Sequence, residues 1–133
     1  MSHRTVILSS FETYLAEDCA PAFRAEEERE RASRLSRFPY TVTLQASFAE
    51  LDFADRWCWQ HFGPSDGDCH QRQSDYPACS IPEPHSHTGK WIWYFFGKTD
   101  YNFGFCEWYF SEQSDRDSFL ASVDEINWGE KYA

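Results

Sequence analysis

The most regular pattern in this chain of 133 residues is an alternation of apolar and polar side chains that begins at Tyr40. Threonine, glutamine or serine fills the polar positions, and the apolar positions are Tyr40, Val42, Leu44, Ala46 and Phe48. Such alternation is typical of a β-strand with one buried and one solvated face. We therefore predict a strand over residues 40–48 whose buried face shares a core with Trp57 and Phe119.

A helix is expected to follow this strand directly. Ser47 and Glu50 have the spacing of a capping box, in which each side chain accepts a hydrogen bond from the other residue's backbone amide. Gly63 provides a stop after apolar residues at helical spacing, which are Leu51, Ala54, Trp57, Cys58 and Phe62. Ser114 is predicted to cap a last helix that carries Phe119, Leu120 and Val123 on its apolar side.

The N-terminal third predicts a short strand and a helix in two parts. Residues 6–8 are apolar, and Ser9 with Glu12 has the spacing of another capping box. Pro21 is expected to interrupt the helix or to begin a second one. Residues 22–37 are mainly Glu, Arg and Ala, with acid-before-base pairs four positions apart that favour a helix. Because this segment has few apolar residues, we expect the helix to project or to pack loosely.

Two aromatic segments near the C-terminus predict a β-hairpin. Residues 91–96 are Trp-Ile-Trp-Tyr-Phe-Phe, a turn is expected from Gly97 to Asp100, and residues 101–110 carry aromatic side chains on both faces. A strand that is apolar on both faces is either covered twice or leaves one face open for a partner.

The order of these elements predicts a single α+β domain over residues 1–133. Its sheet should be small and mostly antiparallel, with three or four strands that include the C-terminal aromatic hairpin, and its helices should pack mainly on one face. Residues 64–90 form a long irregular loop within the domain, and loops of this length are often functional.

The composition adds a high aromatic content and a strong negative charge. Phe, Trp and Tyr make up 19% of the chain, and 22 acidic against 12 basic residues give a formal net charge of -10. An acidic field repels phosphate backbones, so direct nucleic-acid binding is not expected, whereas the basic surface of another protein is attracted. The same charge is also what a merely well-solvated surface would carry.

The sequence also predicts a compartment. No segment approaches the ~20 apolar residues that a membrane span needs, and the N-terminal apolar run is too short for a signal peptide. The five cysteines are odd in number and irregularly spaced, unlike a secreted disulfide framework. We therefore expect a cytoplasmic protein with reduced thiols and no membrane partner.

The long loop and its neighbourhood are rich in potential metal ligands. No bound cofactor is the leading expectation, and zinc is the alternative, because zinc prefers four thiolate or imidazole ligands. The residues that bracket the loop would supply them, namely Cys69, Cys79, His85 and His87. No Cys-x-x-Cys pair is present, so buried thiols and loop histidines explain the same residues without a metal.

A thiol or carboxylate enzyme is a further alternative. Cys69 or Cys79 could act as a nucleophile with a nearby histidine as base, and the candidate bases are His70, His85 and His87. The acidic pairs Asp66/Asp68 and Asp115/Asp117 could act as acid and base or bind magnesium, although the second pair has the position of ordinary helix N-terminal acids.

The leading hypothesis is an acidic, aromatic surface that binds a partner. Aromatic residues dominate interface energetics. Carboxylates can imitate the phosphates of a nucleic acid, and aromatic rings beside them can imitate its bases. The predicted partner-binding residues are Asp52, Asp55, Trp91, Trp93, Asp100, Glu107, Trp108 and Glu112. We expect a small non-enzymatic protein that inhibits or regulates a partner with a basic surface, such as one that binds nucleic acid, as anti-defence and immunity proteins do. The alternative is a protein that binds or sequesters a small ligand in an aromatic pocket.

Overall fold

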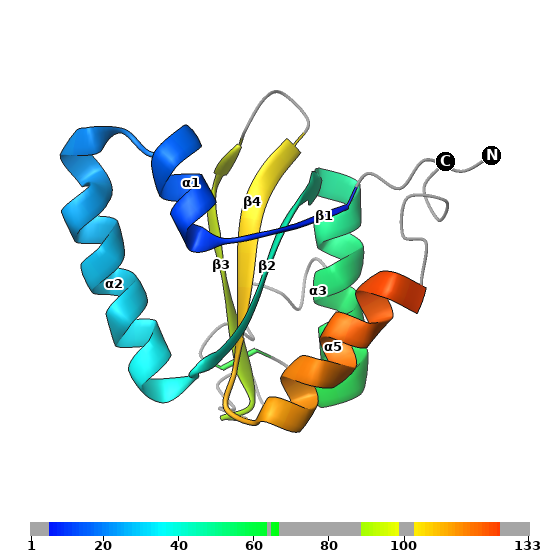
Figure 1. Cartoon of the computed structure of the whole chain (residues 1–133). Coiled ribbons are helices and arrows are strands. Elements are labelled where there is room, and N and C mark those ends of the chain that lie inside the picture. The colour runs from blue at the N-terminus through cyan, green and yellow to red at the C-terminus, as the bar shows by residue number, and fades with distance from the viewer. Residues whose placement is uncertain (1–5, 64, 67–88, 99–102, 126–133) are drawn as a thin grey trace.

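Four antiparallel strands form one sheet in the middle of the molecule (Figure 1). The computed structural model describes residues 6–63, 65–66, 89–98 and 103–125. The strands lie in the order β1-β2-β4-β3, and their bounds are β1 Ile7–Ser9, β2 Tyr40–Ser47, β4 Phe103–Phe110 and β3 Trp91–Lys98. Strands β2 and β4 are therefore central, and the aromatic hairpin places β3 at one edge.

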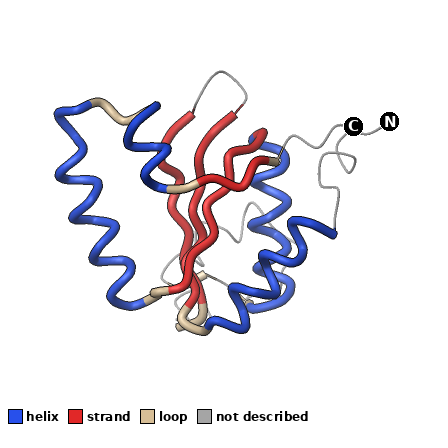
Figure 2. The backbone as a smooth tube through the Cα atoms, viewed as in Figure 1, coloured by secondary structure: helices blue, strands red, loops and turns tan. Residues whose placement is uncertain are grey.

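Helices cover both faces of this sheet (Figures 1 and 2). One face carries α1 (Phe11–Glu17) and α2 (Arg24–Arg37), which a short 3₁₀ turn at Pro21–Phe23 connects. The opposite face carries α3 (Phe48–Phe62) and α5 (Gln113–Glu125). The α+β class and the mostly antiparallel sheet are confirmed. Helices α3 and α5 make the closer contacts with the sheet on one face. Helices α1 and α2 also cover the other face, because β4 carries buried side chains on both of its sides.

The larger core lies between the sheet and the pair α3 and α5. Its strand residues come from alternate positions, as the pattern predicted, and they are Val42, Leu44, Ala46, Cys106, Trp108 and Phe110. Phe119 of α5 is fully buried, while Tyr40 and Trp57 are partly buried and pack against this cluster. The predicted shared core is confirmed for these residues, whereas the side chain of Phe48 lies outside the described structure.

The opposite face has a much smaller apolar cluster. Its buried members are Phe11, Tyr14, Cys19 and Phe105. The ring of Tyr14 stacks on Phe96 with 4.6 Å between the ring centroids. Only α1 contributes buried apolar side chains from the helical layer here, because α2 buries none of its residues.

The local signals at helix ends are mostly confirmed. The backbone amide of Glu50 donates to Ser47 Oγ, and the amide of Ser47 donates to Glu50 Oε1, each over 3.2 Å. Gly63 ends α3 with a φ of 88°, which only glycine adopts readily. The first helix is capped by Ser10, because Ser9 is taken into the sheet opposite Thr43.

Two smaller expectations complete the comparison. Ser114 lies within α5, which begins at Gln113, two residues before the start of a helix capped by Ser114. None of the helices in the described ranges is long and apolar enough to cross a membrane.

The buried face of β2 provides a test of the core. Leu44 is 0% exposed, so Leu44→Ala should lower the free energy of unfolding by about 2–5 kcal/mol, through lost burial and the cavity left behind. The control is Leu8→Ala on the neighbouring strand, where the side chain is 59% exposed and the loss should be about 0.5 kcal/mol or less. Urea denaturation measures both. Equal losses for the two variants would contradict the assignment of Leu44 to the core.

Candidate functional site

Helix α2 is attached to the sheet through arginines. Arg31, Arg34 and Arg37 are three positions apart, so they lie along one side of the helix. On the sheet, Glu107 and Tyr109 are two positions apart on β4 and therefore point to the same face. The two periodicities bring a row of guanidinium groups against a row of polar groups, and this replaces the apolar stripe that a packed helix usually has.

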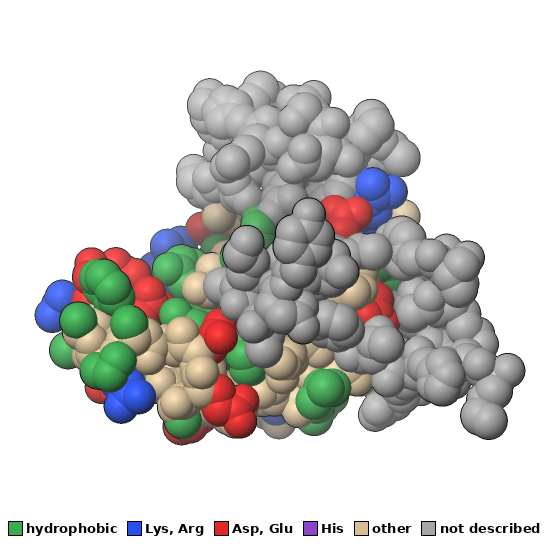
Figure 3. Space-filling view, turned by 90° about the horizontal axis from the view of Figure 1, so that it is seen from above, with side chains coloured by type: hydrophobic (Ala, Val, Ile, Leu, Met, Phe, Trp, Pro, Cys, Tyr) green, Lys and Arg blue, Asp and Glu red, His purple; other side chains and the backbone are tan. Residues whose placement is uncertain are grey.

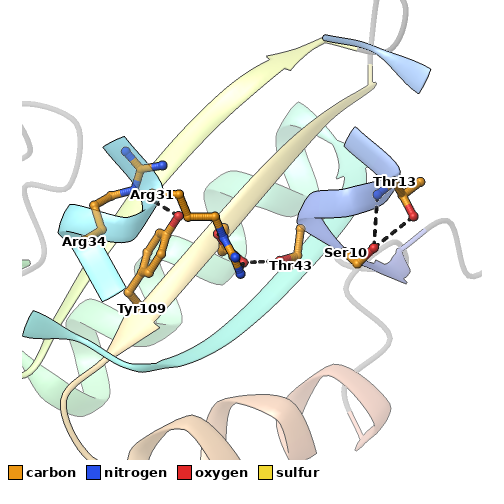
Figure 4. Close-up of polar contacts among 7 residues, drawn as sticks. Ser10, Thr13, Arg31, Arg34, Thr43 and Tyr109 are labelled. Atoms are coloured by element: carbon orange, nitrogen blue, oxygen red, sulfur yellow. Dashed lines mark hydrogen bonds and ion pairs between the residues drawn. The ribbon is translucent and has the colours of Figure 1, made fainter. Parts of the chain in front are cut away.

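The central contact joins Arg31 to Glu107. Arg31 Nε donates to Glu107 Oε1 over 2.9 Å and its Nη2 donates to Oε2 over 3.0 Å. Thr43 Oγ1 on β2 donates to the same carboxylate over 2.6 Å (Figure 4). The Glu107 side chain is 0% exposed, and that of Arg31 is 19% exposed. Burial alone would lower the pKa of Arg31, but the hydrogen bonds and charge of Glu107 raise it, so Arg31 stays charged.

Arg34 extends this contact to the tyrosines of the sheet. Its Nε donates to the hydroxyl of Tyr109 over 2.9 Å (Figure 4). Its guanidinium carbon lies 4.0 Å from the ring centroid of Tyr94. Burial, and then the negative charge of Glu107, raise the pKa of Tyr109, which keeps its phenol neutral. A neutral hydroxyl can accept the hydrogen bond that Arg34 donates.

The inward arginines leave an acidic outer surface on α1 and α2. Arg31 and Arg34 are partly buried against the sheet. The exposed acids of the two helices outnumber the exposed arginines: the acids are Glu12, Glu17, Glu26, Glu28 and Glu30, and the arginines are Arg24, Arg29 and Arg37. Acidic and hydrophobic side chains lie next to each other over this part of the molecule (Figure 3). A segment that is nearly neutral in formal charge therefore presents more negative than positive charge to a partner.

Two adjoining hollows lie beside the Arg31–Glu107 contact. The first, which we name the α1–α2 groove, has a volume of about 290 Å³ and is lined by Phe11, Glu12, Leu15, Glu28, Arg31, Ala32 and Leu35. The second, the β2 notch, has a volume of about 320 Å³ and includes Ser10, Thr41 and Thr43. Phe11, Glu12 and Arg31 line both hollows, so the two are adjacent.

Half of the predicted partner-binding residues lie in the interior. Trp91, Glu107 and Trp108 are 0% exposed and Asp55 is 3% exposed. Trp91 Nε1 donates to the carbonyl of Gly63 over 2.9 Å. The physical reason is the double coverage of β4, which turns the aromatic hairpin into core. These four residues therefore do not form the outward-facing surface that the sequence suggested.

The other predicted partner-binding residues are placed differently. Glu112 is exposed, and Asp52 forms an ion pair with Arg56 over 3.2 Å. Trp93 is partly buried and lines a separate hollow of about 280 Å³ beside β3. Asp100 lies outside the described residues. Binding by these residues stays a prediction.

The metal and catalytic candidates fall largely outside the described structure. This applies to Asp68, Cys69, His70, Cys79, His85 and His87. Within the described part of the chain, no group of three or more His, Cys, Asp or Glu residues could hold a metal ion. Asp66 accepts a hydrogen bond from Arg37 over 2.6 Å, and Asp117 accepts one from Arg116 over 2.7 Å.

The thiols of the described residues are free and buried at Cys19, Cys58 and Cys106. Burial raises the pKa of the Cys58 thiol well above its ordinary value, so this group is neutral and a poor nucleophile. These cysteines act as small apolar side chains in the core.

The most important residue of the site was missed by sequence reasoning. The acid-before-base spacing pairs Arg31 with Glu27, four positions before it, whereas its main partner is 76 positions away. The available signal was Glu107, a single carboxylate within a strand that is otherwise aromatic and apolar. A buried carboxylate needs a cation, and a helix with three arginines on one side could supply it.

No protein-family model matches this chain, and no curated protein or solved structure matches it. Its function therefore has to be argued from the site alone.

The Arg31–Glu107 contact can be tested by a double-mutant cycle. Arg31→Met should lower the free energy of unfolding by about 3–5 kcal/mol, because it leaves a buried carboxylate without its cation. Adding Glu107→Leu should restore part of the loss, since the uncompensated charge is then gone. The control is Arg29→Met on the exposed side of the same helix, where the loss should be about 0.5 kcal/mol or less. Strictly additive losses at Arg31 and Glu107 would contradict a direct coupling.

Glu27 provides a test that depends on pH. Its Oε2 is buried without a hydrogen-bond partner in the described structure, and burial followed by the charge of Glu30 raises its pKa above 4.5. The folded protein therefore holds this proton more tightly than the unfolded chain does, so stability is lost as the pH rises through the raised value. Glu27→Gln imitates the protonated form and should be more stable than the parent near neutral pH.

The advantage of Glu27→Gln should disappear below the ordinary glutamate pKa, where the parent is protonated as well. Thermal unfolding across a pH series measures this difference, with the exposed Glu112→Gln as the control. An advantage that does not change with pH would show that the carboxylate of Glu27 is not destabilised by burial.

Proposed function

We propose that this protein is a non-enzymatic binding protein whose acidic surface occupies a basic surface of a partner protein, and so inhibits or regulates that partner. The partner surface we favour is one that binds nucleic acid, because an acidic protein can compete with phosphates for it. The observation that carries the proposal is the excess of exposed acidic side chains on α1 and α2 together. Of the five arginines of α2, Arg31 and Arg34 contact the sheet. The exposed acids of the two helices are Glu12, Glu17, Glu26, Glu28 and Glu30, and the exposed arginines are Arg24, Arg29 and Arg37.

The charge distribution supports attraction over a distance. The chain has a formal net charge of -10, and the inward contacts of Arg31 and Arg34 remove positive charge from its surface. Complementary charge raises association rates and suppresses wrong partners, but it adds less to the lifetime of a complex. Apolar anchors are needed for lifetime, and exposed apolar side chains are present at Ile7, Leu8 and Phe23.

A small-ligand-binding protein is the second candidate. The β2 notch supports it, because this hollow of about 320 Å³ combines the Arg31 guanidinium with the hydroxyls of Ser10 and Thr43. The volume is at the lower end of the range for small-molecule sites. A metabolite that raises the melting temperature of the parent but not of Thr43→Val would favour this candidate.

The proposal is tested by binding kinetics against a panel of purified DNA-binding and RNA-binding domains of positive net charge. At least one domain should bind, and a short DNA duplex should compete for the same surface. Glu26→Gln with Glu30→Gln should slow association several-fold and flatten its dependence on salt, because rim charges act mainly on the association rate.

The matched control is Arg24→Gln with Arg29→Gln, since both arginines are exposed on the same helix. This variant should associate faster than the parent. If no basic domain binds, or if binding ignores both salt and these substitutions, the proposed function is overturned and the negative charge serves solubility only.

A further inference from the structure

We infer that the α1–α2 groove is the docking site for an amphipathic basic segment of the partner, one that combines an apolar anchor with lysine or arginine. This inference rests on the proposed function and names where the partner binds. The expected occupant is a protein segment and not a polyanion, because the groove is apolar inside and acidic at its rim.

The walls of the groove are two helices whose apolar residues face the hollow. Leu15 of α1 and Leu35 of α2 line it and are only partly buried, and Ala32 is exposed. Phe11 forms part of the lining from its buried position. Two half-exposed leucines on facing helices offer contact area to a partner side chain without a change in the fold.

The charges around the groove select a cation. Glu12 and Glu28 line it and are exposed, while the charge of Arg31 is already balanced by the buried Glu107. The guanidinium of Arg31 also lies 4.6 Å from the ring centroid of Phe11, which holds it at the base of the groove. The remaining field is therefore negative. A lysine or arginine can lay its methylene stem on the leucines and place its charged end at the glutamates.

The size and shape of the groove favour a segment over a compact ligand. Its volume of about 290 Å³ is small for a complete small-molecule site, but sufficient for anchoring side chains. It lies beside the β2 notch, with which it shares Phe11, Glu12 and Arg31. An open hollow between two helices resembles the grooves that accept an amphipathic helix through residues one turn apart.

The test uses a synthetic amphipathic helical peptide of leucine and lysine as the probe, with a leucine and glutamate peptide of the same pattern beside it. The lysine peptide should bind and the glutamate peptide should not. Ala32→Trp should weaken binding at least tenfold by filling the groove from an exposed helix position, where the substitution leaves the core intact. Melting temperature and circular dichroism of the variant verify the fold.

A second pair of variants separates contact from general attraction. Glu12→Gln with Glu28→Gln should speed dissociation of the lysine peptide several-fold. Glu26→Gln with Glu30→Gln neutralises two exposed acids that do not line the groove, so this variant should change only the association rate. Chemical-shift changes caused by the peptide should be concentrated on α1 and α2.

The outcomes distinguish the two proposals. If a basic nucleic-acid-binding domain binds in a salt-dependent manner but ignores Ala32→Trp, the proposed function stands and the groove is overturned. If Ala32→Trp weakens both the peptide and the domain, the groove is supported. If both peptides bind the parent and Ala32→Trp equally, the groove has no selectivity and the inference is wrong.

Discussion

The structure depends on a carboxylate that is fully enclosed in the middle of a central strand. Glu107 on β4 is 0% exposed, and an ionised group in such a place is tolerated only when it is paired and hydrogen-bonded. Arg31 supplies the charge from α2, and Thr43 supplies a further hydrogen bond from β2. One side chain therefore holds together two strands and a helix. Because the arginine contact is bidentate, it also determines the rotation and position of α2 against the sheet.

The two faces of the sheet are consequently stabilised by different interactions. The face under α3 and α5 is closed by apolar packing, with Leu44, Trp108 and Phe119 at 0% exposure. The face under α1 and α2 combines a small aromatic cluster with arginine contacts, and these do not require the two helices to pack closely against one another. The α1–α2 groove exists for this reason, and the same contacts turn the acidic side chains of α2 toward solvent. Fold stability and the proposed binding surface thus have one common cause.

Local patterns predicted much of the fold, and tertiary pairings explain what they missed. The alternation around Leu44 and the Ser47–Glu50 capping box are short-range signals, and both are confirmed. The expectation that α2 packs loosely was based on its low apolar content. Apolar content alone does not predict a helix that contacts the sheet through guanidinium groups. The burial of Trp91 and Trp108 was also not decidable locally, because an aromatic strand gives the same pattern whether its second face meets solvent or a helix. Glu107 within that strand was the evidence for a covering helix with positive charge.

The absence of buried residues on α2 has a consequence for the native ensemble. The free energy needed to open a segment locally depends on how much apolar surface the opening exposes to water, so the work of releasing α2 is concentrated in Arg31 and Arg34 and not spread along the helix. We therefore expect helix α2 to open separately from the apolar core, and a bound segment that bridges α1 and α2 would couple this helix to the rest. Ligand binding would then be visible as slower amide hydrogen exchange along a whole helix, well beyond the residues that touch the ligand.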